Sequence, residues 1–340
     1  MTTTQTQTRP EAPRPVEEQA KPALLSAARL QDLLIRNAMV VVLLLVMAYF
    51  SYESARFATV ANVRTILIAA APFALVALGQ TLVILTGGID LSVGSVIAVS
   101  AMTAAKIVLG HPERLWLALG AAIAVGILCG LINGLLVSRL NVPPFVATLG
   151  MMTAASGAAF VIGDGAPING LPAEFGRIAN TRVLGFPAPV WVMLVGFAIV
   201  ALVMHRTSFG LRVYAVGGNR TAAEVAGVNV RRTLTTVYVV SGALAGISGV
   251  ILASRVISGP PTLGQGYELD AIAAVVIGGA SLMGGRGTVW GTALGLLLIQ
   301  TLNNGLDLLV VPAYWQQVIK GVLIAAAVAV DMWATKRRST

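Results

Sequence analysis

The stretch Leu115–Val137, LWLALGAAIAVGILCGLINGLLV, contains no charged residue. A helix needs about 20 mostly apolar residues to cross the hydrocarbon core of a bilayer, and this stretch has that length. Its glycines fit the same interpretation, because small residues let transmembrane helices approach one another closely. The stretch therefore predicts a membrane-spanning helix packed against neighbouring helices.

The composition of the whole chain extends this prediction to the rest of the molecule. Residues of the AVILMFWYC class make up 56% of the chain and charged residues only 11%, whereas about a quarter of a soluble domain is charged. The net charge of +9 is typical of nucleic-acid binding, but the basic residues lie between apolar blocks and at the two ends, as membrane orientation signals do. We predict an all-α, polytopic membrane helix bundle and exclude a soluble enzyme and a nucleic-acid binder.

Hydropathy divides the chain into a tail and a membrane domain. Residues 1–30 are predicted to form a disordered cytoplasmic tail, since their first 25 positions are rich in Thr, Gln, Pro and Glu and have no apolar period. Residues 31–335 are predicted to form one transmembrane domain. Its ten expected spans are 36–53, 63–85, 92–109, 115–137, 143–163, 190–204, 234–254, 268–282, 288–309 and 314–332. The sixth and eighth are short for a full crossing, and glycine pairs flank the end of the eighth, which predicts a broken or re-entrant helix.

The distribution of Lys and Arg predicts the orientation of this bundle. With both termini in the cytoplasm, the outer loops hold only Arg56, Arg114, Arg177, Arg182 and Arg255. Three basic residues, Arg64, Lys106 and Lys320, fall inside expected spans. The inner segments hold Arg9, Arg14, Lys21, Arg29, Arg36, Arg139, Arg206, Arg212, Arg220, Arg231, Arg232, Arg286, Lys336, Arg337 and Arg338. This threefold bias is what the positive-inside rule expects.

The segment Gly87–Ser95, GGIDLSVGS, joins two apolar spans and carries a carboxylate. Gly87 and Gly88 permit positive φ and close backbone approach. Asp90 followed by Ser92 fits a helix cap, in which a side-chain oxygen accepts from free N–H groups. It fits equally a pore-lining or gate element, because ionisable groups within a membrane usually face protein or water. Both interpretations stay open, and a weak echo of the segment at Gly278–Leu282 leaves an internal repeat open as well.

A few polar side chains inside the expected spans are further candidates for lining a substrate pathway. In lipid such groups need partners, either on a neighbouring helix or in a hydrophilic path. Two adjacent asparagines on a helix point about 100° apart, so one partner cannot easily satisfy both. Phe145 follows a proline pair at a helix start and is a candidate gate residue. The full set of pathway candidates is Gln80, Thr81, Asp90, Ser92, Phe145, Thr148, Asn303 and Asn304.

The inner connector Arg212–Gly227 is a candidate docking element. Good helix formers occupy Thr221–Ala226, and Gly227 fits a C-terminal cap. A short helix that lies along the membrane surface suits a groove in a partner; the alternative is a solvated loop held inside by its arginines. The candidate coupling residues are Arg212, Gly217, Gly218, Asn219, Arg220, Ala222, Ala223, Glu224 and Gly227.

Several kinds of chemistry are not expected. None of the four lysines, Lys21, Lys106, Lys320 and Lys336, follows a glycine, so the chain has no G-K-[ST] phosphate loop. Cys129 is the single cysteine, and His111 and His205 lie at block edges, which argues against a metal site. Asp90 is the one carboxylate expected near the middle of the bundle, which gives an ion-coupled carrier little support.

The chain resembles the membrane permease subunit of bacterial ribose-type monosaccharide ABC importers over residues 55–332. The matching segments are Gly79-Gln80-Thr81, Gly87–Ser95, Pro143-Pro144-Phe145 with Thr148-Leu149-Gly150, Ala215–Gly227, Glu268–Gly279 continuing to Gly291, Asn303-Asn304-Gly305 and Gln317–Gly321. Ala222-Ala223-Glu224 with Gly227 is similar, in permuted form, to the E-A-A…G loop that ABC permeases insert into their ATPase. No match covers the tail before residue 30.

The resemblance implies a multi-pass protein of the bacterial inner membrane that works by alternating access. Its expected partners are a second permease copy, cytoplasmic ABC ATPase subunits that bind ATP and magnesium, and a periplasmic or lipid-anchored sugar-binding protein. No cofactor is expected in this chain. The rival interpretations are an ABC permease for an amino acid, nucleoside or polyol, and a stand-alone ion-coupled carrier; a membrane enzyme would need a nucleophile or metal constellation that the sequence lacks.

Overall fold

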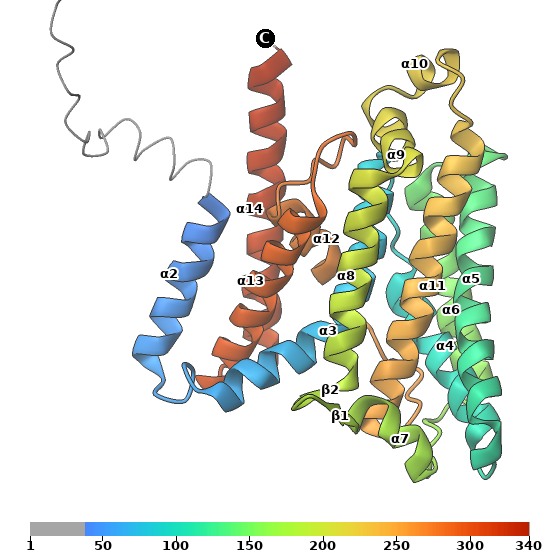
Figure 1. The fold of residues 1–340 in the computed structure, drawn as a ribbon, viewed down its shortest axis with the longest axis vertical. Coiled ribbons are helices and arrows are strands. Elements are labelled where there is room, and N and C mark those ends of the chain that lie inside the picture. The colour runs from blue at the N-terminus through green and yellow to red at the C-terminus, as the bar shows by residue number, and fades with distance from the viewer. Residues whose placement is uncertain (1–37, 340) are drawn as a thin grey trace, which may run out of the picture.

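The computed structural model describes residues 38–339, so the predicted tail lies outside the described residues. The chain forms a bundle of helices with one small hairpin (Figure 1). The long helices are α2 (Ala38–Glu53), α3 (Val60–Leu85), α4 (Val93–Val108), α5 (Leu115–Ser138), α6 (Pro144–Ile162), α8 (Ala188–Arg206), α11 (Val230–Val256), α13 (Val289–Leu308) and α14 (Ala313–Ser339). The shorter elements are the 3₁₀ turn η1 (Pro112–Arg114), α7 (Ala173–Asn180), the strands β1 (Arg182–Val183) and β2 (Phe186–Pro187), α9 (Ser208–Gly218), α10 (Arg220–Val225) and α12 (Tyr267–Ile277).

Each of the ten expected spans coincides with a helix, which confirms the all-α membrane bundle. Five segments are long and apolar enough to cross a membrane: α3, Pro112–Ser138, α6, α8 and α11. The expectation that the sixth span is short was wrong, because α8 extends it to Ala188–Arg206, 19 residues. The eighth is short, since α12 has 11 residues and ends at Ile277, with Gly278 as its C-cap. The number of crossings and the side on which the termini lie stay predictions.

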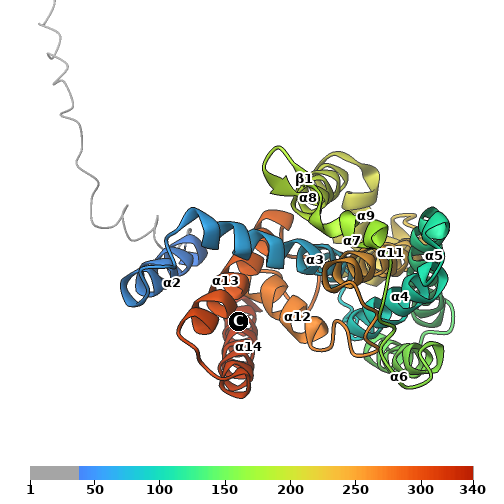
Figure 2. The same ribbon diagram turned by 90° about the horizontal axis from the view of Figure 1, so that it is seen from below.

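Glycine faces hold the centre of the bundle together. α5 and α11 pack antiparallel, and a Cβ added at Gly126 would collide with the carbonyl oxygen of Gly242, while one at Gly130 would collide with that of Tyr238. Such close backbone contact is the usual way in which transmembrane helices associate. Helix α3 lies between this pair and α13, with the residues from Ala70 to Leu85 buried. Seen from below, α4, α5, α6 and α11 gather on one side of it and α2, α13 and α14 on the other (Figure 2).

Two glycine-rich segments, which we call the glycine breaks, meet at one end of α3: Gly87-Gly88 after α3, and residues 278–287 after α12. Both α3 and α12 end in a Schellman motif: Gly88 N–H donates to Val83 O at 3.1 Å, and Ala280 N–H donates to Val275 O at 3.1 Å, with Gly87 and Gly279 at positive φ. The breaks also touch, because Gly285 N–H donates to Leu85 O at 3.0 Å. This likeness is local, and an internal repeat of the whole chain stays a prediction.

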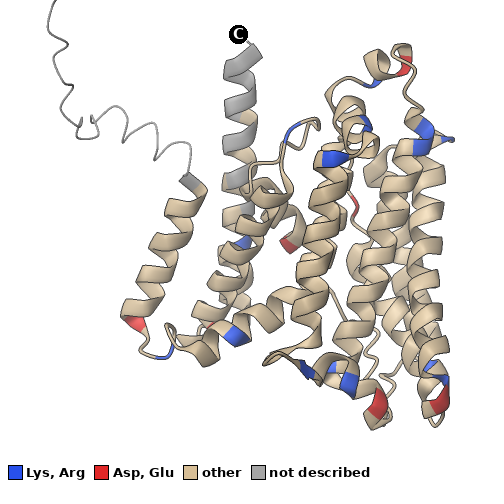
Figure 3. Cartoon of the chain, viewed as in Figure 1, with Lys and Arg blue, Asp and Glu red and all other residues tan. Residues whose placement is uncertain are grey.

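Charge separates the two ends of the bundle (Figure 3). Among the described residues, the end that carries α9 and α10 holds a single acid, Glu224, beside its basic residues Arg139, Arg206, Arg212, Arg220, Arg231, Arg232 and Arg286. The opposite end, with α7 and the hairpin, mixes the signs: Arg114, Arg177 and Arg182 lie there with Glu113 and Glu174. The helix order therefore brings the arginines that the sequence assigned to the inner side onto one end.

Candidate functional site

The unwound segment between α3 and α4 carries Asp90 into the interior, where its residue is 1% exposed. One carboxylate oxygen accepts from the Ser92 N–H at 3.0 Å and from Ser92 Oγ at 2.6 Å. The other accepts from Ser241 Oγ of α11 at 3.0 Å. Asp90 therefore fixes the turn that precedes α4, whose N-cap residue Ser92 makes no side-chain cap bond, and ties that turn to α11.

Side chains of three further helices close around the same segment. On α3 the amide of Gln80 lies against the Asp90 backbone. With the amide nitrogen assigned to the side that faces the Asp90 carbonyl oxygen, it donates to that oxygen at 3.1 Å and accepts from the Asp90 N–H at 3.3 Å. On α5, Asn133 donates to Ser92 Oγ at 2.9 Å, and on α6, Thr148 Oγ1 donates to Ile89 O at 3.2 Å. Irregular backbone inside a membrane needs such internal partners. Four pathway candidates, Gln80, Asp90, Ser92 and Thr148, thus form one buried polar cluster.

The other pathway candidates lie elsewhere. Thr81 Oγ1 and Thr292 Oγ1 of α13 are 2.7 Å apart, and Asn304 exchanges two hydrogen bonds with Asn62 at 2.7 and 2.9 Å. Both contacts join α3 to α13. Phe145 is exposed at the start of α6. Asn303 points away from the pair that holds Asn304, and its buried Oδ1 has no partner among the described residues.

Two adjoining cavities, which we call the trough, form a groove that the sequence did not predict as a unit. The first, about 630 Å³, lies between α4, α6 and the loop before α12. The second, about 780 Å³, lies between α12, α13 and α14. Gln265 and Glu268 line both cavities. The polar lining residues of the trough are Ser95, Thr153, Ser156, Thr262, Gln265, Glu268, Asp270, Gln300, Asn303, Asp307, Gln316, Gln317 and Lys320.

An ion pair forms one wall of the second cavity. Lys320 Nζ of α14 lies 3.0 Å from Asp270 Oδ2 of α12, with side chains 22% and 15% exposed. The expectation that Asp90 is the one carboxylate inside the bundle was therefore wrong, since α12 carries Asp270 and Glu268 into it. The sequence did carry a signal for these residues, because an ionisable residue inside a predicted span is rare and usually paired. The partner of Asp270 could not be read from the sequence, since Lys320 lies 50 positions away.

Of the pathway candidates, Asn303 is the one that lines the trough. The buried cluster around Asp90 lines none of the cavities described for this part of the chain. Its residues hold helices together in this conformation, and a direct role in transport stays a prediction.

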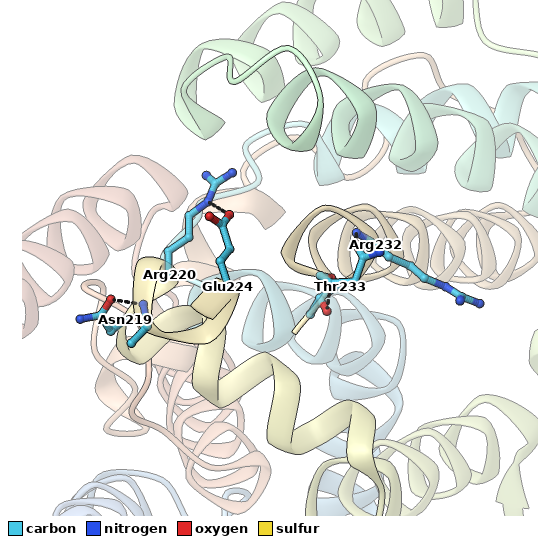
Figure 4. Close-up of polar contacts among 7 residues, drawn as sticks. Asn219, Arg220, Glu224, Arg232 and Thr233 are labelled. Atoms are coloured by element: carbon cyan, nitrogen blue, oxygen red, sulfur yellow. Dashed lines mark hydrogen bonds and ion pairs between the residues drawn. The ribbon is translucent and has the colours of Figure 1, made fainter. Parts of the chain in front are cut away.

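The candidate docking element forms two short helices, α9 and α10 (Figure 4). Asn219 caps α10 by accepting from the Ala222 N–H at 2.9 Å. Arg220 and Glu224 form an exposed pair at 3.7 Å. Gly227, at positive φ, ends the helix in a Schellman motif, with Val228 N–H donating to Ala223 O at 2.9 Å. Exposed polar groups on a well-capped helix leave its outer face free to meet a partner.

Helix α9 packs closely against the glycine breaks. A Cβ on Gly217 would collide with the carbonyl oxygen of Leu85, and it would lie 2.6 Å from the N atom of Gly285. Tyr214 Oη donates to Gly287 O at 2.9 Å. Burial raises the pKa of Tyr214. A displacement of α9 would therefore press on the segments that lead to Asp90 and to α13.

Metal binding has no support within the described residues, where no group of three His, Cys, Asp or Glu side chains could hold an ion. That His111 and His205 form no metal centre stays a prediction.

Comparison with known proteins places these features in a family. Residues 62–328 match the family model described as the permease component of branched-chain amino acid transport systems. The ribose import permease protein RbsC of Escherichia coli is 43% identical over 302 residues, which are 88% of this chain and 94% of the relative. Its counterpart in Bacillus subtilis is 46% identical over 260 residues, 76% of this chain and 80% of the relative. The D-allose transport system permease protein AlsC of Escherichia coli is 36% identical, over 87% of this chain and 91% of the relative. No solved structure matches the chain.

Proposed function

Because the chain belongs to the family of ABC importer permeases that contains these relatives, we propose that it is the membrane-spanning subunit of an ATP-driven monosaccharide importer. It is a multi-pass protein of the bacterial inner membrane. The relatives' names specify ribose, D-allose and, for a permease 35% identical, L-arabinose. A pentose or aldohexose is therefore the substrate class that we assign to this chain.

The trough is the observation that carries the proposal. In a chain with 11% charged residues, its walls concentrate amides, hydroxyls and carboxylates. A sugar presents hydroxyls that both donate and accept, and amides and carboxylates match them. Lipid tails offer no such groups, which argues against the trough as a surface facing the bilayer. We assign the trough to the translocation pathway.

The assembly follows from the two ends of the bundle. Helices α9 and α10 lie at the arginine-rich end and supply the coupling contact for a cytoplasmic ABC ATPase, which binds the ATP and magnesium. The opposite end, with α7 and the hairpin, faces the sugar-binding protein. A second copy of the permease completes the pathway by covering the open side of the trough. ATP binding then moves α9 and, through Gly217 and the glycine breaks, the helices that bear the trough.

The test is reconstitution of the permease in liposomes with its ATPase and binding protein. We expect uptake of a labelled monosaccharide that requires ATP and all the components. Leucine, adenosine and ribitol form the comparison panel, since the rival ABC interpretations predict transport of one of them instead. Uptake by the permease alone under a proton or sodium gradient, without ATP, would overturn the proposal in favour of the ion-coupled carrier.

A further inference from the structure

We infer that the Asp270–Lys320 pair and the amides around it form a monosaccharide-binding station within the trough, where the sugar pauses during transport. This inference rests on the proposed function, because it names a binding site along the proposed pathway. The juxtaposition that carries it is a half-buried ion pair, 3.0 Å between Lys320 Nζ and Asp270 Oδ2, in the wall of a cavity of about 780 Å³.

The pair keeps unused hydrogen-bonding capacity toward the cavity. Among the described residues, the Lys320 ammonium donates one hydrogen bond, to Asp270, and Asp270 Oδ1 accepts none. A carboxylate offers about four acceptor positions and an ammonium three donors. A neighbouring pair of sugar hydroxyls can therefore donate to the carboxylate while a third oxygen accepts from the ammonium. Hydrogen bonds that involve a charged partner are about twice as strong as neutral ones.

Stability alone gives no good reason for the pair. An ion pair taken out of water loses hydration free energy that its mutual attraction often fails to restore. An apolar pair would join α12 to α14 at least as well in a membrane bundle. An ionisable pair beside a cavity is better explained by a polar ligand that meets it there.

Amides surround the pair and select the class of ligand. Gln265, Gln300, Asn303 and Gln317 line the same cavity, and Asn303 Oδ1 is buried without a partner among the described residues. A zwitterionic amino acid could also meet an Asp–Lys pair, but a branched-chain side chain needs an apolar wall beside it. Amides on several sides favour a compact ligand with hydroxyls all around it.

Glu268 closes the station toward the first cavity. Its carboxylate oxygen Oε1 accepts from the Gly266 N–H at 3.3 Å, and a Cβ on Gly94 of α4 would collide with the same side chain. Gly94 therefore makes room for a carboxylate between the two cavities. A sugar leaving the station passes this group, which offers it a second acceptor.

Thiol labelling tests the station directly, since Cys129 is the single cysteine of the chain. In a Cys129→Ala background, Asn303→Cys places a thiol in the second cavity, and Leu184→Cys places one on the exposed hairpin, outside the trough. The full complex in liposomes is treated with a small maleimide, with and without D-ribose, D-allose or L-arabinose. We expect the transported sugar, at ten times its Kd, to slow labelling at position 303 roughly tenfold, because only the unoccupied site exposes the thiol. Labelling at position 184 should not change.

Kinetics of a second variant separate ligand binding from a purely structural pair. Asp270→Asn together with Lys320→Gln keeps hydrogen bonding between α12 and α14 but removes both charges. We expect a rise in KM of about tenfold, because charged hydrogen bonds to the sugar are lost, in a permease that inserts normally. Lys106→Met, which removes the exposed lysine of α4, is the matched control and should leave KM unchanged.

The possible results separate a failure of the binding station from a failure of the proposed function. Unchanged or absent labelling of the Asn303→Cys variant in a complex that imports the sugar, or an unchanged KM in the double variant, would refute the station and leave the proposed function standing. Protection by leucine instead of a sugar would reassign the station to an amino acid. A wild-type complex without ATP-driven sugar uptake would refute the proposed function itself.

Discussion

At the scale of single residues, Asp90 shows how one side chain meets two needs. The sequence left a helix cap and a pore-lining group equally open. In the structure Asp90 accepts from the Ser92 N–H in the turn before α4, while the N-cap of α4 is Ser92 without a side-chain cap bond. Asp90 also makes a contact to α11 through Ser241 that no local pattern could reveal. The polar residues that line the trough were mostly missed for the same reason, because α4, α6, α12, α13 and α14 each contribute only a few of them.

Replacing Asp90 by alanine should destabilise the permease more than replacing it by asparagine. Alanine leaves buried Ser92 and Ser241 donors without their acceptor, and each such group costs about 1–3 kcal/mol. Asparagine keeps an acceptor oxygen for Ser92. Thermal unfolding of the detergent-solubilised protein, followed by size-exclusion chromatography, measures the order. A wild-type midpoint for Asp90→Ala would contradict the role assigned to the carboxylate.

Gly217 and Gly218 offer an adjacent pair of test positions. Gly217→Val should abolish coupled transport, since any Cβ there meets the carbonyl oxygen of Leu85 and forces α9 away from α3. Gly218→Ala should be tolerated, because nothing lies within 4 Å of the added Cβ. ATP-driven uptake per inserted permease distinguishes the two. Equal activities would mean that the contact of α9 with α3 has no part in coupling.

At the scale of elements, the long helices were predictable and the short ones less so. Leu115–Val137 and its counterparts carry enough apolar residues to be placed within a few positions, and the glycine pairs after α12 marked its early end. Helix α9 was not foreseen. The sequence favoured helix from Thr221 onward, but Ser208–Gly218 is held as a helix by packing of Gly210, Val213 and Val216 against the bundle, which is a tertiary effect. The hairpin β1–β2, with two residues in each strand, is too short to leave a periodic pattern.

Helix α10 should determine ATPase binding. Glu224→Arg reverses the acidic charge of this end, repels Arg220 across the exposed 3.7 Å pair and changes the surface offered to the partner. We expect the ATPase to co-purify several-fold less well while the permease inserts normally. Glu113→Arg, a charge reversal at the opposite end of the bundle, is the control. Full ATPase recovery with Glu224→Arg would remove α10 from the docking surface.

At the scale of the whole molecule, the side of the membrane on which each end lies is the prediction on which the rest of the proposal depends. In the Cys129→Ala background, a thiol in place of Glu224 should react with a membrane-impermeant maleimide only in inverted vesicles, and a thiol in place of Leu184 only in intact spheroplasts. The reason is the excess of arginine around α9 and α10, which is retained in the cytoplasm. The reverse pattern would place the coupling helices outside, where no ATPase could reach them.

The main-chain contact between the two glycine breaks has an implication for mutagenesis. Gly285 meets Leu85 through main-chain atoms, so an alanine in place of Leu85 would leave that hydrogen bond intact. An alanine in place of Gly285 would instead be strained at positive φ, and its Cβ would lie 2.7 Å from Gly218 Cα. A one-residue deletion or insertion between Ser281 and Gly287 would shift the donor out of register. Such length variants test whether α3 and the segment that follows α12 move together.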